Sequence, residues 1–301
     1  MGNIFKDLAI KYHTGSLLIK LIFINIAVFL IVRLTGVVLT LSGTDINPLL
    51  SYLQLPSNLS ILAWRPWTLV SYMFLQYDLL HILFNMLWLY WFGQLFLHFF
   101  SEKQMGGLYI LGGLSGAGLY LLAYNLIPWF SSTYGVLLGS SAAVLAIVIA
   151  TAVYAPDFKI SLLFFGAVSL KYIALITVLL DAISITSQNA GGHIAHLGGA
   201  MLGFIFAYRW KQGKDITRFI NTLIDKIVVL FKPRPKIKIK YRRPESDMEY
   251  RTRKQKETED IDAILDKIKR SGYSALTTEE KTIRCKQKIK RSEWAGYVLL
   301  I

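Results

Sequence analysis

Polar side chains stand inside several apolar stretches of this 301-residue chain, which is 54% hydrophobic and only 17% charged. A polar or ionisable side chain in a membrane span is costly, so it marks a candidate functional site by default. The candidates are His81, Asn85, Ser140, Ser141, Asp181, His193 and His196. Serine, histidine and asparagine are residue types that acyl transfer uses, since a hydroxyl becomes a nucleophile when a neighbouring base accepts its proton.

Six apolar runs reach the length of about 20 residues that a transmembrane helix needs. They lie at residues 17–40, 79–100, 105–127, 135–154, 168–187 and 190–209. The loop between the first two is too polar to span and is rich in Trp, Tyr and Leu, which favours partial burial in the membrane interface. We therefore predict an all-α polytopic membrane protein with six transmembrane helices, an interfacial first loop and a small helical cytoplasmic tail.

The second, fourth and sixth runs cross the membrane in the same direction, so residues equally far past their starts lie at equal depth. Ser141 and His196 are each about six residues into their runs, while His81 and Asn85 are about two and six residues into theirs. At about 1.5 Å per residue, all four lie within roughly 10 Å of the outer boundary. We expect Ser141 to be the nucleophile and His196 the base that activates it.

Oxyanion donors and close helix packing complete this predicted site. His81 and Asn85 are four residues apart and share one helical face, so we expect them to join the backbone N–H of Ser141 in stabilising an oxyanion. Gly139 would let the substrate backbone approach. Gly199 and Gly203 form a small-xxx-small pair, which predicts tight packing of the last span against the span that carries Ser141.

Most of the positive charge follows the last span. Residues 1–210 hold nine Lys and Arg residues against six acidic residues, so the last 91 residues carry +11 of the net +14. Segment 219–231 has the pattern of an amphipathic helix on the membrane surface, and the basic run KPRPKIKIKYRR at 232–243 favours anionic lipids as a partner. No groove-reading motif or stacking platform accompanies this charge, so nucleic acid is not an expected partner.

The division of the chain follows from these patterns. Helical spacing over 261–268 predicts a tail helix that Gly272 stops, and Thr277 with Glu280 predicts the capping box of a second one. The predicted regions are a cytoplasmic N-terminus (1–16), a six-span core (17–210), an amphipathic and basic juxtamembrane segment (211–243) and a small cytoplasmic helical region (244–301). Lys and Arg in the short connections place both termini in the cytoplasm, and the compact core with this charge pattern favours a bacterial plasma membrane.

Four motifs together resemble the rhomboid family of intramembrane serine proteases. They are HILFN at 81–85, LGSSAA at 138–143, AHLGGAMLG at 195–203 and WRPWT at 64–68. The resemblance covers roughly residues 15–210, and the order and spacing of the motifs make it specific. It implies a Ser141/His196 dyad, His81 with Asn85 at the oxyanion site, and cleavage of a transmembrane protein substrate near its outer end. It also implies that no metal or cofactor takes part.

Two positions depart from the family pattern, since Ala142 replaces a frequent glycine and Gln76 a frequent histidine. The alternative function is therefore a catalytically weak or inactive relative that binds membrane-protein clients. A transporter is disfavoured because no duplicated halves or broken helices are evident.

Other chemistry at the polar positions is also disfavoured. We interpret Ser140 as a packing residue and His193 as a polar residue at the mouth of its span. A metal site is not expected, because no His-Glu-x-x-His motif occurs. Asp181 is expected to hydrogen-bond to a neighbouring span rather than to pair with Asp78 as an aspartyl protease would.

Overall fold

The structure is a computed structural model that describes residues 4–131, 133–162, 166–231 and 245–281. It divides the chain into two compact units, Met1–Lys232 and Pro233–Ile301. The first unit contains the apolar helices and all the candidate site residues. The basic run 232–243, predicted to contact lipid, lies outside the described residues.

Four helices of the first unit are long and apolar enough to cross a membrane: α2 (Leu17–Leu41), α6 (Leu79–Phe99), α7 (Glu102–Leu126) and α11 (Ala190–Lys211). They match the first, second, third and sixth predicted runs within about three residues. Ser101 caps α7 with a capping box to Gln104, which satisfies backbone N–H groups that have no partner inside the helix. The chain is therefore a helical, multi-pass membrane protein.

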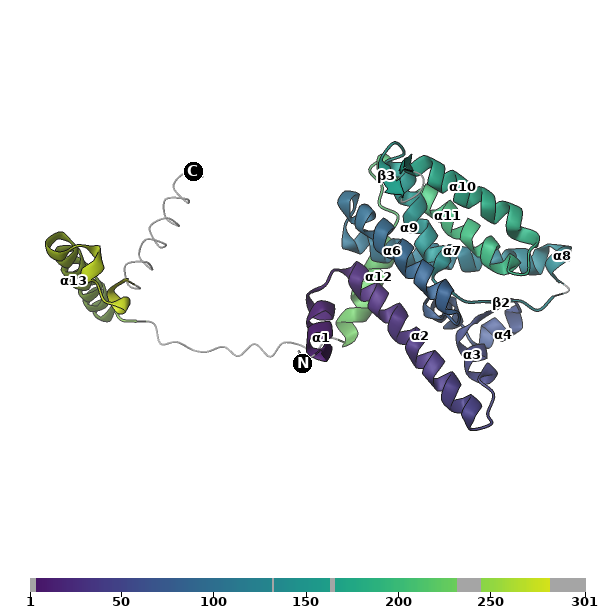
Figure 1. Cartoon of the computed structure of the whole chain (residues 1–301), viewed down its shortest axis with the longest axis horizontal. Coiled ribbons are helices and arrows are strands. Elements are labelled where there is room, and N and C mark those ends of the chain that lie inside the picture. Colours follow the sequence, from purple (N-terminus) through teal and green to yellow (C-terminus); the bar gives the residue numbers. More distant parts are fainter. Residues whose placement is uncertain (1–3, 132, 163–165, 232–244, 282–301) are drawn as a thin grey trace. The chain divides into compact units, whose positions relative to one another are not determined.

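The helix predicted over 135–154 begins later than expected. Helix α9 (Ser141–Tyr154) has 14 residues, about 21 Å of helix, whereas Val136 and Leu137 form strand β2, paired antiparallel with β1 (Leu55–Pro56). Every side chain from Ala142 to Ala152 is buried, because α9 packs against α6, α7, α10 and α11 (Figure 1). Non-helical backbone is tolerated at this point because its polar groups pair with β1 and with the carbonyl of Tyr72.

The fifth predicted run is also shorter as a helix. Helix α10 (Leu170–Ile183) has 14 residues and continues as the 3-10 turn η2 (Ser184–Thr186). Before it, β3 (Lys159–Leu162) pairs antiparallel with β4 (Gly166–Ser169). The two short sheets are additions to the all-α prediction, since neither has a strong sequence signal.

The loop between α2 and α6 is folded rather than extended. It contains α3 (Asn47–Leu53), β1, α4 (Leu59–Trp64), α5 (Thr68–Ser71) and the 3-10 turn η1 (Tyr72–Phe74). Nη1 of Arg65 donates a 2.8 Å hydrogen bond to the carbonyl of Ser51, and the guanidinium lies 4.1 Å from the centre of the Tyr52 ring. The backbone N–H of Gly139 donates to the carbonyl of Tyr72 at 2.9 Å. This loop therefore fixes the segment that leads into α9.

Shorter helices flank these elements. Helices α1 (Ile4–Thr14) and α8 (Pro128–Ser131) lie before α2 and after α7 in the chain. Helix α12 (Arg218–Phe231) follows α11 and packs against α7, where Lys103 and Asp225 form a 2.7 Å ion pair. Phe219 and Val229 of α12 are largely exposed, as an amphipathic surface helix requires.

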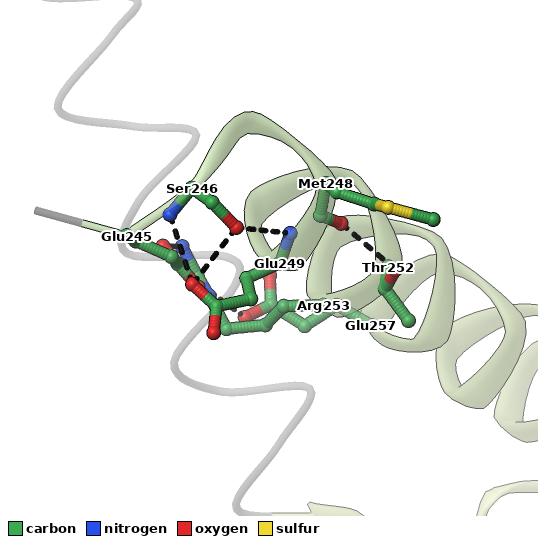
Figure 2. A network of polar contacts seen from close by, with 7 residues as sticks. All are labelled: Glu245, Ser246, Met248, Glu249, Thr252, Arg253 and Glu257. Atoms are coloured by element: carbon green, nitrogen blue, oxygen red, sulfur yellow. Dashed lines mark hydrogen bonds and ion pairs between the residues drawn. The ribbon is translucent and has the colours of Figure 1, made fainter.

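The second unit is built on helix α13 (Asp247–Ser271). The Ser246 hydroxyl accepts from the backbone N–H of Glu249, and the Glu249 carboxylate accepts from the backbone N–H of Ser246 (Figure 2). The helix ends before Gly272, whose φ of +77° suits glycine. The 3-10 turn η3 (Tyr273–Ala275) then returns the chain, so that Leu276 is buried, as Ile264 of α13 is.

The packing of α11 on α9 depends on two glycines. A Cβ built on Gly199 would overlap the carbonyl of Ala142, and one on Gly203 would overlap the carbonyl of Ala146. Helix backbones approach this closely only where side chains are absent. The predicted tight packing of the last span is thus present, and its partner is the helix that begins with Ser141.

We expect Gly203→Val to lower the free energy of unfolding by about 1–3 kcal/mol, because the added side chain must separate α11 from α9. Thermal unfolding in detergent measures this loss. The matched control is Gly118→Ala on α7, where an added Cβ meets no heavy atom within 4 Å. Equal unfolding temperatures for Gly203→Val and wild type would contradict the close packing.

Candidate active site

Ser141 and His196 are in direct contact. Ser141 is the first residue of α9 and His196 lies on the second turn of α11, and Oγ of the serine is 2.6 Å from Nε2 of the histidine. The contact follows from the glycine packing, because Gly199 is three residues after His196 and touches Ala142, the neighbour of Ser141. A hydroxyl so close to an imidazole nitrogen can transfer its proton as it attacks a carbonyl.

The other ring nitrogen of His196 faces a buried carboxylate. Nδ1 of His196 lies 2.8 Å from Oδ1 of Asp181 on α10, and Nδ1 of His193 lies 2.8 Å from the same oxygen. The Asp181 side chain is only 8% exposed. The sequence predicted a hydrogen bond from Asp181 to a neighbouring span, but the pattern gave no sign that the two histidines would be its partners.

His81 covers the glycine that precedes the serine pair. A Cβ built on Gly139 would lie 2.9 Å from Cε1 of His81 and 3.7 Å from Oγ of Ser141, and Gly139 has a φ of +123°. Both the space and the backbone conformation therefore require glycine. His81 and Ser141 thus both lie beside Gly139, and their role at an oxyanion stays a prediction.

Asn85 is buried and takes part in a different contact from the one predicted. Its Nδ2 donates a 3.0 Å hydrogen bond to Oε1 of Gln76. An amide nitrogen carries two hydrogens, so this bond uses one of the two that a primary amide can offer to an oxyanion. The same contact holds the Asn85 side chain in place.

Gln76 is the centre of a buried polar network. Its Nε2 lies 3.3 Å from Oδ1 of Asn25 and 3.2 Å from Oγ of Ser140, and all three residues have no exposed surface. Asn25 in turn donates to the hydroxyl of Tyr109. Sequence reasoning missed Asn25, although an asparagine in the middle of the apolar run FINIAV is a usable signal. Ser140 is more than the packing residue predicted.

The methyl group of Ala142 faces away from the serine hydroxyl. A Cβ built on Gly116 of α7 would lie 2.7 Å from Cβ of Ala142, and Ala142 is 2% exposed. The methyl therefore fills the contact between α9 and α7. Its contact is with the neighbouring helix α7.

One group of side chains among the described residues could hold a metal ion. It consists of Asp181, His193 and His196, whose ligand atoms lie within 4.8 Å of one another. Both Nδ1 atoms already contact the carboxylate, and His196 contacts Ser141 through Nε2. These contacts use Oδ1 of Asp181, while its Oδ2 is buried and has no hydrogen-bond partner among the described residues.

Comparison with known proteins identifies the family of the membrane unit. The model of the rhomboid domain matches residues 63–212, a range that contains His81, Ser141, Asp181 and His196. The membrane unit of this chain belongs to the rhomboid family. A separate model, a family of unknown function (DUF6576), matches residues 245–283, which include α13.

Two curated rhomboid relatives show how far the similarity extends. Rhomboid protease GlpG of Yersinia pseudotuberculosis is 28% identical over 203 residues, which is 66% of this chain and 64% of that protein. RHOMBOID-like protein 12, mitochondrial, of Arabidopsis thaliana is 30% identical over 163 residues, or 50% of this chain and 48% of that protein. The chain thus spans less than two thirds of the length of each of these rhomboid relatives.

The buried network predicts that Gln76→Leu destabilises this rhomboid domain by about 1–3 kcal/mol for each polar partner left unsatisfied. Asn25, Ser140 and Asn85 would all lose a partner. The measurement is thermal unfolding in detergent, with Gln94→Leu at an exposed position of α6 as the matched control. If both leucine variants have the same unfolding temperature as wild type, the network does not stabilise the fold.

Proposed function

We propose that this rhomboid-family protein is an intramembrane serine endopeptidase that cleaves transmembrane protein substrates through Ser141 and His196. The observation that carries the proposal is the 2.6 Å contact between Oγ of Ser141 and Nε2 of His196 inside a bundle of membrane helices. The name of the Yersinia relative, rhomboid protease GlpG, supports a protease, and the arrangement of hydroxyl and imidazole favours the serine type.

The reaction would proceed by acyl transfer. Oγ of Ser141 attacks the carbonyl carbon of the scissile peptide bond while its proton passes to Nε2 of His196. His81, Asn85 and the backbone N–H of Ser141 would stabilise the negative charge that forms on the carbonyl oxygen. The intermediate then breaks the C–N bond, and the leaving amine takes the proton from His196. A water molecule then attacks the acyl carbon while His196 accepts its proton, and the C–Oγ bond breaks as His196 returns that proton to Oγ of Ser141.

The depth of the nucleophile favours a transmembrane substrate. Ser141 begins a helix whose next eleven side chains are buried, and the folded first loop is hydrogen-bonded to the segment before it. A peptide bond at the end of a substrate's membrane helix would reach Ser141 without leaving the membrane region. The outward-facing Leu175, Leu179 and Ile183 of α10 are at least half exposed, as lipid contact or a substrate helix requires.

The alternative function was a weak or inactive relative that binds membrane-protein clients. It rested on Ala142 and Gln76, and neither side chain comes between Ser141 and His196. The methyl of Ala142 packs towards Gly116, and Gln76 bonds to Asn25, Ser140 and Asn85. The endopeptidase is therefore the function we favour.

The placement in the membrane is part of the same proposal. With α9 and α10 counted as short inner and peripheral spans, the protein crosses a bacterial plasma membrane six times with both termini in the cytoplasm. The amphipathic α12 and the basic segment 232–243 would then lie at the inner leaflet, where anionic lipids attract Lys and Arg. Regions 1–16, 17–210, 211–243 and 244–301 keep the roles predicted for them.

Replacing the nucleophile tests the reaction type. We expect Ser141→Ala to lower cleavage of a single-span model substrate at least about 10³-fold and to abolish labelling by a fluorophosphonate probe. Ser187→Ala, at an exposed serine after α10, should cleave and label as wild type does. Ser140→Ala should retain labelling in protein that folds. Undiminished cleavage by Ser141→Ala would overturn the proposed mechanism.

The single cysteine of the chain tests the orientation. In intact bacteria, a membrane-impermeant maleimide should leave Cys285 unmodified, and permeabilised cells should be labelled, because the tail is proposed to lie inside. The matched control is Cys285→Ser combined with Ser131→Cys, which moves the thiol to exposed Ser131 of α8 at the proposed outer face. Labelling of Cys285 in intact cells would reverse the proposed orientation.

A further inference from the structure

We propose that Asp181 is a positioning residue for His196, so that the site works as a serine–histidine–aspartate triad rather than as a two-residue dyad. The inference rests on the proposed function, because it concerns how the base of that reaction is held. The observation that supports it is a continuous chain of contacts across three helices. The chain runs from Ser141 on α9 through His196 on α11 to Asp181 on α10. The two links measure 2.6 Å and 2.8 Å.

The carboxylate fixes which nitrogen of His196 is protonated. An ionised carboxylate only accepts hydrogen bonds, so Nδ1 of His196 must donate its proton to Oδ1 of Asp181. A neutral imidazole protonated at Nδ1 has its acceptor at Nε2. That nitrogen is the one beside the hydroxyl of Ser141, so the bond to Asp181 leaves the ring ready to accept the serine proton.

The same carboxylate stabilises the ring after proton transfer. His196 becomes a cation once it has taken the proton of Ser141, and the Asp181 side chain, 8% exposed, lies in direct contact with it. Charges interact more strongly where water is excluded. The negative charge therefore acts mainly on the protonated histidine that forms during the reaction, as a catalytic aspartate does.

His193 holds the carboxylate in position. It lies three residues before His196 on the same helix, and its Nδ1 contacts the same Oδ1 at 2.8 Å. The second oxygen, Oδ2, is buried and has no hydrogen-bond partner among the described residues. The direction in which the carboxylate points is thus set by the two imidazoles.

Kinetics of an amide variant test the inference. In Asp181→Asn, size is conserved and charge is lost, so kcat for cleavage of a single-span substrate should fall by about 10²–10⁴-fold while KM changes less than about twofold. Asp181→Glu should recover part of kcat. The matched control is Asp157→Asn, which removes an exposed carboxylate beside Lys171 at the start of α10 and should leave kcat and KM unchanged.

The outcomes separate this inference from the proposed function. If Ser141→Ala and His196→Ala are inactive and Asp181→Asn, folded, retains kcat within threefold of wild type, the triad is wrong and a dyad remains. If wild type is inactive, both proposals fall. If excess EDTA abolishes cleavage and Zn²⁺ restores it, the three side chains hold a metal ion instead, and the triad is wrong.

A spectroscopic measurement decides the matter if Asp181→Asn does not fold. The chain has five histidines, and nitrogen-15 NMR of the imidazoles reports which ring nitrogen carries the proton. The His196→Ala variant identifies the His196 signal. A neutral His196 protonated at Nδ1 is expected in wild-type protein. A neutral His196 protonated at Nε2 would overturn the inference, because that tautomer cannot donate to Asp181 and accept from Ser141.

Discussion

The close approach of α11 to α9 is the contact on which the rest of the site depends. Gly199 and Gly203 place the backbone of α11 against the carbonyls of Ala142 and Ala146. A larger residue at either glycine would move α11 outwards. His196 would then move with it, because the helix is rigid over the one turn that separates His196 from Gly199. The length of the contact between Ser141 and His196 is therefore set by helix packing below it.

Packing alone does not explain why α9 begins at Ser141. The residues before Ser141 form the short strand β2, which pairs with β1 of the first loop. The backbone N–H of Gly139 then donates to the carbonyl of Tyr72 in the same loop. Gly139 then turns the backbone in a conformation that side chains disfavour, with His81 over it. The first backbone N–H groups of α9, which have no partner inside the helix, and the half-buried Ser141 therefore follow a segment that the first loop holds in place.

The membrane helices and their tightest contact could be predicted from the sequence, because both follow from the lengths of the apolar runs and from residue spacing. Four membrane helices begin and end close to the predicted residues. The glycine spacing on α11 also predicted its tight contact with α9. The start of α9 was misread because a buried strand and a buried helix are equally apolar over a few residues. The contacts of Asp181 and Gln76 were missed for another reason. They join residues nine or more positions apart through side-chain directions, which hydropathy does not encode.

The two adjacent serines show how the polar groups of the bundle are divided. Ser140 faces the network of Gln76, Asn25 and Tyr109, where a hydroxyl satisfies buried amides. Ser141, one residue further along, faces His196, which in turn contacts Asp181. Successive residues at a helix start point in directions about 100° apart, so one short segment serves both groups. The network joins Gln76, which follows the first loop, to α2, α6 and the start of α9, and the Ser141 hydroxyl lies directly after it in the chain.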